Sequence, residues 1–321
     1  MNPADIIQVV GLSKSFNGLP ALDNVSFAVR RGEIFGYLGA NGAGKTTTIK
    51  ILCGLLGRDS GEIDIAGADI AKDPVTVKQC LGVVPDESNL YPELTCQRNL
   101  EYLGELYGLT RAVRQKRRAE LLAAFSLTEK AATPFGALSR GLKRRLTIAA
   151  ALIHAPEILF LDEPTTGLDV PSAKSLRALL QQINQQDGVT VFLTTHNLYE
   201  AEALCHRIQI IHKGRTVVTG TAPEIRQRVE RVKTLEVTLD RPVSQEWWGS
   251  DLPGGKPPVQ LQDRWRLELA GQDLHQVLKL LLSRTEAEGL HIMDLRTGGA
   301  SLEDAFVAIL QGQADGMSQE A

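Results

Sequence analysis

Residues 39–50 have the composition and spacing of a loop that binds phosphate. The stretch GANGAGKTTTIK matches the pattern G-x-x-x-x-G-K-[ST] and lies between an apolar strand, IFGYL, and a helix within TTTIKILCGLL. Glycines let successive backbone N–H groups point at phosphate oxygens, and a helix start adds the positive end of its dipole. Lys45 would reach the β- and γ-phosphates, and the Thr46 hydroxyl would bind Mg²⁺. The alternative is a glycine-rich turn with an incidental lysine. The residues expected to bind nucleotide here are Gly39, Asn41, Gly42, Ala43, Gly44, Lys45, Thr46 and Thr47.

Two acidic residues and a histidine follow apolar strands. ILFLDEP places Asp162 and Glu163 at the end of a strand, and VTVFLTTH places His196 at the end of another. The carboxyl ends of strands are where α/β sheets hold their ligands. Asp162 is suited to hold a metal ion, and Glu163 to orient or deprotonate a water that attacks the γ-phosphate. The alternatives are a solvent-facing acidic turn and an ordinary loop histidine.

The stretch LSRGLKRRL, residues 138–146, combines a serine and a glycine with the start of a basic helix. Ser139 and the amides around Gly141 could hold an anion, although one exposed helix dipole contributes only about 0.3 to 1 kcal/mol. The alternative is a capped surface helix whose basic residues, Lys143, Arg144 and Arg145, are solvated.

The elements around these residues indicate an α/β protein. Up to about Gly67 the sequence predicts short strands and hairpins, an antiparallel layer that leads into a buried strand. Leucines recur at helical spacing within residues 95–127, which predicts a helical subdomain; we give it the bounds of about residues 88–150. Strand and helix then alternate through ILFLDEP, VTVFLTTH and RIQIIHKG, which indicates a parallel sheet covered by helices.

The character of the sequence changes past about Val232. WWGSDLPGGKPP contains enough glycine and proline to form a loop. The stretches WRLELA, LHQVLKLLL, LHIMDLR and SLEDAFVAIL then predict strand, helix, strand and helix. We therefore predict a first domain at residues 1–232 and a small α+β domain at residues 233–321.

The composition narrows the function. With a formal charge of −3 and no long basic block, the chain of 321 residues is not expected to bind nucleic acid. No stretch resembles a signal peptide, and no apolar run approaches the roughly 20 residues that span a bilayer. A function at a membrane would need a channel from another chain. The four cysteines lack any C-x-x-C pair, which argues against a zinc site or disulfide framework; they are Cys53, Cys80, Cys96 and Cys205.

In their order, over about residues 5–230, these motifs resemble the nucleotide-binding subunits of ATP-binding cassette (ABC) transporters. The resemblance implies a P-loop NTPase of ABC type that uses ATP and Mg²⁺. It matches residues 39–47 to the Walker A loop, Asp162 and Glu163 to the Walker B pair, and His196 to the switch histidine that contacts the γ-phosphate. It implies that Glu163, His196 and Lys45 are catalytic.

Two further residues gain a role from this resemblance. Phe16 of LSKSFNG resembles the aromatic residue that stacks on adenine. Asp169 of TTGLD resembles the D-loop aspartate. The alternatives are that Phe16 packs within the first hairpin and that Asp169 is a turn residue or helix cap before Pro171.

LSRGLKRRL resembles the family signature LSGGQ, which contacts the ATP of a second subunit in a head-to-tail dimer. Ser139 and Gly141 would then complete the ATP site of a second copy or a paralogue. The resemblance implies a peripheral subunit at the cytoplasmic face of the membrane, bound to a membrane-spanning permease and driving export. SLEDAFVAIL is similar to the closing helix of some exporter-type subunits.

Two positions depart from the family pattern. Asp86 follows VVP where a glutamine normally touches Mg²⁺, and Arg140 replaces the first glycine of the signature. An aspartate can still bind a hard cation, so we include Asp86 among the expected metal ligands with Thr46 and Asp162. We hypothesise that Arg140 offsets the charge of Asp86 across the dimer. The alternative is that Arg140 points to solvent and the two changes are independent.

Two other functions fit the sequence less well. A soluble ABC ATPase that remodels a macromolecular complex usually carries two ATPase units or a long coiled coil, and neither is present here. An unrelated P-loop kinase or GTPase would leave the signature stretch and His196 without a role. The sequence therefore favours the ATP-hydrolysing subunit of an exporter.

Overall fold

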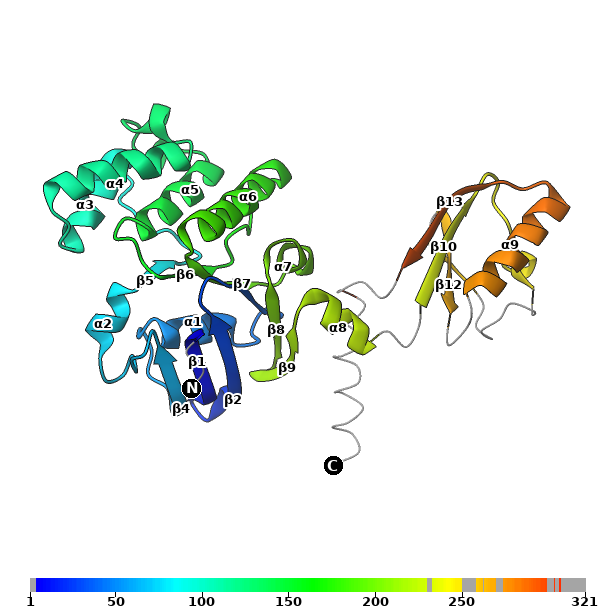
Figure 1. The fold of residues 1–321 in the computed structure, drawn as a ribbon, viewed down its shortest axis with the longest axis horizontal. Helices are drawn as coiled ribbons and strands as arrows, with labels where there is room; N and C mark the ends of the chain where they lie inside the picture. The colour runs from blue at the N-terminus through cyan, green and yellow to red at the C-terminus, as the bar shows by residue number, and fades with distance from the viewer. Residues whose placement is uncertain are drawn as a thin grey trace. The chain divides into compact units, whose positions relative to one another are not determined.

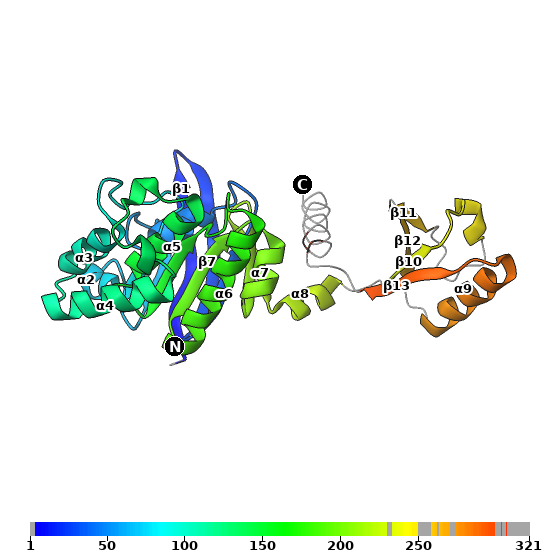
Figure 2. The same ribbon diagram turned by 90° about the horizontal axis from the view of Figure 1, so that it is seen from above.

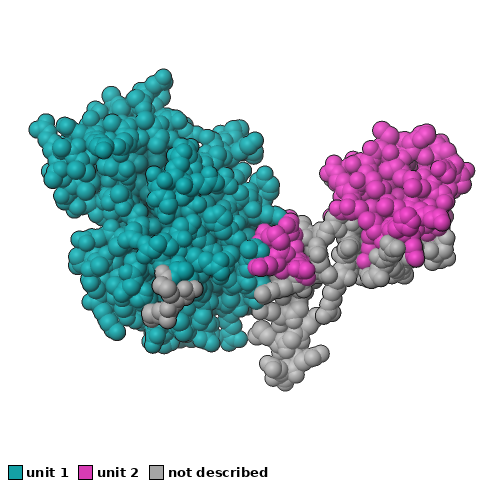
Figure 3. Space-filling view, viewed as in Figure 1, with its two compact units in different colours: residues 1–221 teal, residues 222–321 magenta. Residues whose placement is uncertain are grey.

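The chain forms two compact units, which we describe from a computed structural model (Figure 1). The structure describes residues 4–229, 233–249, 258–261, 263–269, 274–298, 303 and 306. The units comprise residues 1–221 and 222–321 (Figure 3). Their division lies before the expected boundary at residue 232, so helix α8 (Ala222–Val229) falls within the second unit. None of the described helices combines the length and hydropathy needed to cross a bilayer.

A six-stranded sheet forms the centre of the first unit. Its strand order is β5-β6-β7-β3-β8-β9, and all neighbours are parallel except β8 and β9. Because β6 and β7 are adjacent and parallel, the residues that follow them lie at one edge of the sheet. The strands are β3 (Ile34–Leu38), β5 (Leu81–Val84), β6 (Ile158–Asp162), β7 (Thr190–Thr195), β8 (Arg207–His212) and β9 (Arg215–Gly220).

An antiparallel sheet makes a second layer, as the sequence predicts. Its order is β2-β1-β4, with β1 (Asp5–Phe16) between β2 (Leu19–Arg30) and β4 (Ser60–Ile65). Alternate residues of the central sheet face different layers. Phe35, Phe160 and Phe192 join the core shared with the antiparallel sheet, whereas Leu159 and Leu193 join the core under the helices.

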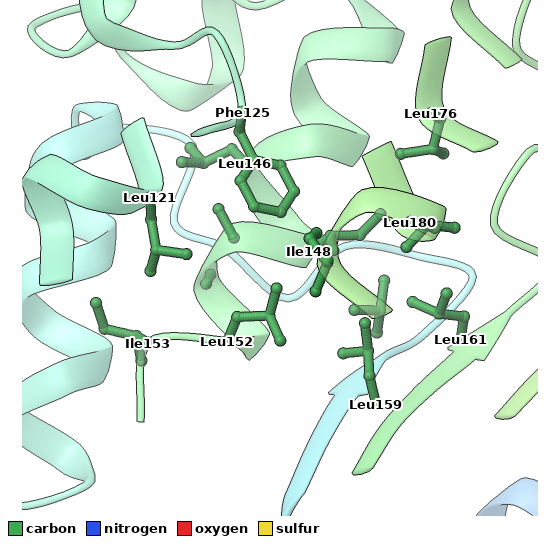
Figure 4. Close-up of a cluster of buried hydrophobic side chains, with 14 of the residues drawn as sticks. Leu121, Phe125, Leu146, Ile148, Leu152, Ile153, Leu159, Leu161, Leu176 and Leu180 are labelled. Carbon is green, nitrogen blue, oxygen red and sulfur yellow. The ribbon is translucent and has the colours of Figure 1, made fainter. Parts of the chain in front are cut away.

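Helices α3, α4, α5 and α6 gather beyond the other face of the central sheet (Figures 1 and 2). Figure 4 shows the core they cover, where Leu146 and Ile148 of α5 meet Leu159 and Leu161 of β6. Thr95 and Thr110 cap α3 and α4, so the predicted helical subdomain is two capped helices packed beside α5. The helices of this unit are α1 (Lys45–Leu52), α2 (Pro74–Gln79), α3 (Cys96–Leu106), α4 (Arg111–Ala124), α5 (Arg140–Ala151), α6 (Val170–Asp187) and α7 (Leu198–Leu204).

In the described part of the second unit, an antiparallel sheet of order β11-β12-β10-β13 packs with helix α9. Its core contains Trp248, Trp265, Val277 and Leu281. The predicted strand, helix and strand are confirmed at β12, α9 and β13. The predicted helix SLEDAFVAIL lies outside the described residues except at positions 303 and 306. The elements are β10 (Lys233–Leu239), a 3-10 turn (Gln245–Trp248), β11 (Val259–Leu261), β12 (Arg264–Leu269), α9 (Leu274–Glu288) and β13 (Ile292–Gly298).

Replacement of Phe192 tests the aromatic core between the two sheets. Its ring centroid lies 5.3 to 5.8 Å from those of Phe27, Phe35, Tyr37 and Phe160. We expect Phe192→Ala to lower the free energy of unfolding by about 3 to 5 kcal/mol, measured by urea denaturation with circular dichroism. Phe192→Leu, the control, keeps most of the volume and should cost less. Equal losses for the two variants would contradict this account.

Candidate active site

The phosphate loop lies between β3 and α1, and backbone conformation or close packing requires glycine at several of its positions. Gly44 has φ +108°, and a Cβ there would lie 2.8 Å from the carbonyl oxygen of Ala21. A Cβ at Gly39 would lie 2.7 Å from the carbonyl oxygen of Ile211, while Gly42 has φ +81° in open space. Among the described residues no side chain caps α1, so its first N–H groups remain available to an anion.

Three predicted catalytic residues from different segments meet at this loop. Lys45 is 6% exposed, and its Nζ donates to the carbonyl oxygens of Gly39 (2.8 Å) and Ala40 (3.3 Å). The same Nζ lies 3.2 Å from Oε1 of Glu163. Nδ1 of His196 lies 2.7 Å from Oε2 of Glu163. Glu163 is therefore the centre of a contact that joins the phosphate loop to the end of β7.

These side chains open onto a pocket of about 370 Å³. The pocket gathers the phosphate loop, the segment after β5 and the ends of β6 and β7, which are far apart in sequence. Its lining residues are Ala21, Asn41, Gly42, Gly44, Lys45, Thr46, Thr47, Asp86, Glu163, Thr166 and His196.

Asp162 lies beneath this pocket and is 7% exposed. Thr46 Oγ1 donates to its Oδ2 at 3.2 Å, and Thr194 Oγ1 donates to its Oδ1. A buried carboxylate needs such donors because transfer from water is costly. The carboxylate and the Thr46 hydroxyl are hard oxygen ligands and lie within reach of one small cation.

Glu163 has a strained backbone. Its φ is +48°, in the left-handed region that a residue with a Cβ seldom adopts. The Glu163 amide donates to the carbonyl oxygen (3.2 Å) and the hydroxyl (3.1 Å) of Thr194. These two bonds hold a conformation that costs on the order of 1 to 3 kcal/mol and aim the carboxylate at Lys45 and His196.

Seven predicted site residues do not line the pocket: Asp162, the loop residues Gly39 and Ala43, and the more distant Phe16, Ser139, Gly141 and Asp169. Phe16 is 44% exposed, with Lys14 Nζ 5.6 Å above its ring, so it is not packed within the hairpin. Ser139 caps α5, where its Oγ accepts a hydrogen bond from the Leu142 amide at 3.5 Å, and Gly141 follows in the first turn. Asp169 caps α6, as its alternative interpretation predicts.

The cap at Asp169 fixes where α6 begins, and the first turn of α5 packs beside it. Asp169 Oδ1 accepts from the Ser172 amide at 2.7 Å, and hydrogen bonds from the Ser172 hydroxyl and amide hold the pKa of Asp169 below its usual range. A Cβ at Gly141 would lie 3.1 Å from Ser172 Oγ. The signature stretch and the D-loop therefore lie against each other in one chain.

The two departures from the family pattern lie close together in one chain. Asp86 and Arg140 both line a smaller pocket of about 180 Å³, together with Glu163 and Thr166. The Arg140 guanidinium lies directly over the Cα of Gly167: a Cβ added at Gly167 would be only 2.1 Å from the Arg140 Cζ. Although Arg140 is exposed, its tip contacts the D-loop of its own chain.

Sequence reasoning missed two buried charged residues beside the site. Arg144 is 9% exposed, so the solvated alternative is wrong for this residue. Glu200 is 1% exposed, accepts the Thr195 hydroxyl at 2.7 Å, and has a pKa raised by burial. Neither stands out locally, since Arg144 lies within a basic run and Glu200 lies in the first turn of a short helix.

Comparisons with known proteins agree with this arrangement. The family model described as ABC transporter matches residues 22–166. The linearmycin resistance ATP-binding protein LnrL of Bacillus subtilis is 40% identical over 308 residues, which cover 94% of this chain and 97% of that protein. The chain belongs to the ABC transporter family. It is an ATP-binding subunit with the ATPase fold of that family.

Other members of the ABC transporter family are similar over most of their length. The Nod factor export ATP-binding protein I of Ralstonia nicotianae is 37% identical, with 95% of this chain and 93% of that protein covered. A solved ATP-binding subunit of an ABC transporter has a TM-score of 0.63 and 34% identity over 70% of this chain and 93% of its own. The cassette MJ0796, solved as a dimer with ADP and Pi, has a TM-score of 0.61 and 28% identity, with 67% of this chain and 98% of that chain covered.

Two glycines of the ABC phosphate loop offer a matched test of its packing. Gly42→Ala introduces a left-handed alanine in open space and should cost about 1 to 2 kcal/mol. Gly44→Ala adds overlap with the backbone of Ala21 and should cost about 1 to 3 kcal/mol more. Thermal unfolding of both variants measures the difference. A Gly44→Ala variant as stable as Gly42→Ala would show that the loop can relax.

Proposed function

We propose that this chain hydrolyses ATP as the motor subunit of an exporter, with Glu163, Lys45 and His196 as its catalytic residues. The observation that supports it is the contact of Glu163 with both Lys45 and His196 at the mouth of the pocket. Such a contact places a general base beside two groups that can bind a γ-phosphate. Walker A residues 39–47 would bind the other phosphates, and Phe16 would stack on adenine.

The same pocket suits Mg²⁺. Thr46 and Asp162 supply oxygen atoms 3.2 Å apart, and the carboxylate-bearing residue Asp86 lines the pocket wall. When bound, the ion would neutralise phosphate charge and polarise the bond to the leaving group. In this scheme Glu163 orients the attacking water and accepts its proton, while Lys45 and His196 exchange their contact with Glu163 for oxygens of the γ-phosphate.

A second subunit would complete the site. Ser139 and Asp169 are exposed at the starts of α5 and α6, with Gly141 in the first turn of α5, and all three lie outside the pocket, where they would face another protomer. The similar cassette MJ0796 forms a dimer. In the proposed cycle two copies, or this chain and a paralogue, close on two ATP molecules and reopen after hydrolysis and product release.

A groove beside the helical subdomain is suited to a permease. It has a volume of about 580 Å³, and its exposed residues include Leu55, Val75 and Tyr107. Pro85, which precedes Asp86, also lines it, so a docked segment would adjoin the ATP pocket. We place the chain peripherally at the cytoplasmic face of the membrane. The named functions of its relatives, drug resistance and Nod factor export, favour export over remodelling of a soluble complex.

Replacement of Glu163 tests the proposed general base. Glu163→Gln keeps the shape of the side chain but cannot accept the proton, so kcat should fall roughly 10²- to 10⁴-fold while ATP still binds. Steady-state hydrolysis and fluorescent-nucleotide titration measure the two effects. Glu157→Gln is the control, because Glu157 pairs with Arg31 instead of the site. Full activity in Glu163→Gln would exclude this role.

Asp86 and Arg140 line the same small pocket of one chain. We therefore propose that their charges offset each other within one chain and not between the two subunits of a dimer. A mixture of Asp86→Gln and Arg140→Gly chains distinguishes the two. Within-chain compensation predicts that the mixture has the mean ATPase activity of the two variants, because each chain keeps its own defect. Compensation across the dimer would restore a native pair at one site of each mixed dimer. Activity clearly above the mean would therefore contradict our proposal.

A further inference from the structure

Arg144 makes four hydrogen bonds to backbone carbonyls around the ATP pocket. Its Nε donates to Pro164 at 3.0 Å, and its NH2 donates to Asp162 at 2.5 Å. Its NH1 donates to Pro85 at 2.6 Å and to Asp86 at 3.3 Å. One side chain from α5 therefore joins the segment after β5, the end of β6 and the start of the D-loop.

This guanidinium is buried at a cost. Arg144 forms no ion pair among the described contacts, and burial lowers its pKa, although the nearby charges of Asp86, Asp162 and Glu200 act in the opposite direction. Burial of a cation without a direct counterion is tolerated only when its hydrogen bonds are made. The planar fork of arginine suits several carbonyls at fixed angles, which a lysine ammonium cannot match.

The carbonyls that Arg144 binds belong to residues that carry, or adjoin, the chemistry. Asp86 and Asp162 are proposed metal ligands, and Glu163 stands between Asp162 and Pro164. A shift in any of these backbones would move the Glu163 carboxylate or the metal ligands. An error of about 1 Å in such a site can reduce the rate about 100-fold.

We infer that Arg144 is a positioning residue of the ATPase reaction, which holds the backbones at Pro85–Asp86, Asp162 and Pro164 in register for hydrolysis. The inference rests on the proposed function, because it assigns Arg144 to the same site. Arg144 contacts no nucleotide in this scheme. It acts through the segments that carry Asp86, Asp162 and Glu163.

Arg145 provides a matched control on the same helix. Its NH2 donates to Ser175 Oγ at 2.7 Å, and its NH1 donates to the Phe125 carbonyl oxygen at 3.3 Å, so both bonds lead away from the pocket. Removal of either arginine deletes hydrogen bonds of α5. Only removal of Arg144 releases the segments around the pocket.

The experiment compares Arg144→Ala with Arg145→Ala in the full chain. We expect Arg144→Ala to lower kcat for ATP about 10- to 100-fold, with a KM change below about threefold, because the Walker A loop is untouched. Arg145→Ala should lower the melting temperature with kcat per folded protein nearly unchanged. Equal loss of kcat in both variants, or a loss of stability alone in Arg144→Ala, would overturn the inference.

Two further measurements separate positioning from folding. Guanidinium at a few millimolar should restore part of the kcat of Arg144→Ala and none in Arg145→Ala, since only the first leaves four carbonyls unbonded at the site. Arg144→Lys keeps the charge and should fold, yet recover less activity than the native arginine. Full activity in Arg144→Lys would also refute the inference. A wild-type chain that hydrolyses no ATP would refute the proposed function itself.

Discussion

The buried carboxylate of Asp162 is the constraint on which the rest of the site depends. Removal of such a charge from water costs several kcal/mol, so its position is stable only where donors meet it. Thr46 from α1 and Thr194 from β7 supply those donors. Thr194 lies on β7, which pairs with β6, and Thr46 lies at the start of α1, which follows β3 on the other side of β7. The carboxylate therefore ties the phosphate loop, the Walker B strand and the strand before His196 into one unit.

The sequence was sufficient to predict the parts of the site that are set locally. The glycine spacing of residues 39–47 predicts a loop between strand and helix, and this loop is present. ILFLDEP and VTVFLTTH predict buried strands with polar ends, and parallel pairing of β6 with β7 brings Glu163 and His196 together. The start of α6 was also accessible, because Asp169 is the helix cap that its alternative interpretation predicts.

Contacts that depend on distant segments could not be predicted. Nothing in LSRGLKRRL distinguishes the buried Arg144 from its neighbours, because its acceptors lie 18 to 59 positions away in sequence. The contact of Arg140 with Gly167 is of the same kind. The strand β10 also went unpredicted, since its alternation, from Leu235 to Leu239, follows directly on the expected boundary. Its position in the sheet is set by antiparallel pairing with β12 and β13, which its own residues do not specify.

Helix α5 has a consequence beyond the site it borders. Ser139 at its cap and Arg144 in its second turn are five positions apart, about 7.5 Å along a stiff helix. In a closed dimer, Ser139 would contact the nucleotide bound to the other subunit, while Arg144 would still bind the backbone around the ATP pocket of its own subunit. Because this segment of α5 is short and rigid, a displacement of Ser139 would also displace Arg144. Binding of nucleotide at one site would then change the backbone positions at the other site, and the two sites would bind and hydrolyse ATP cooperatively.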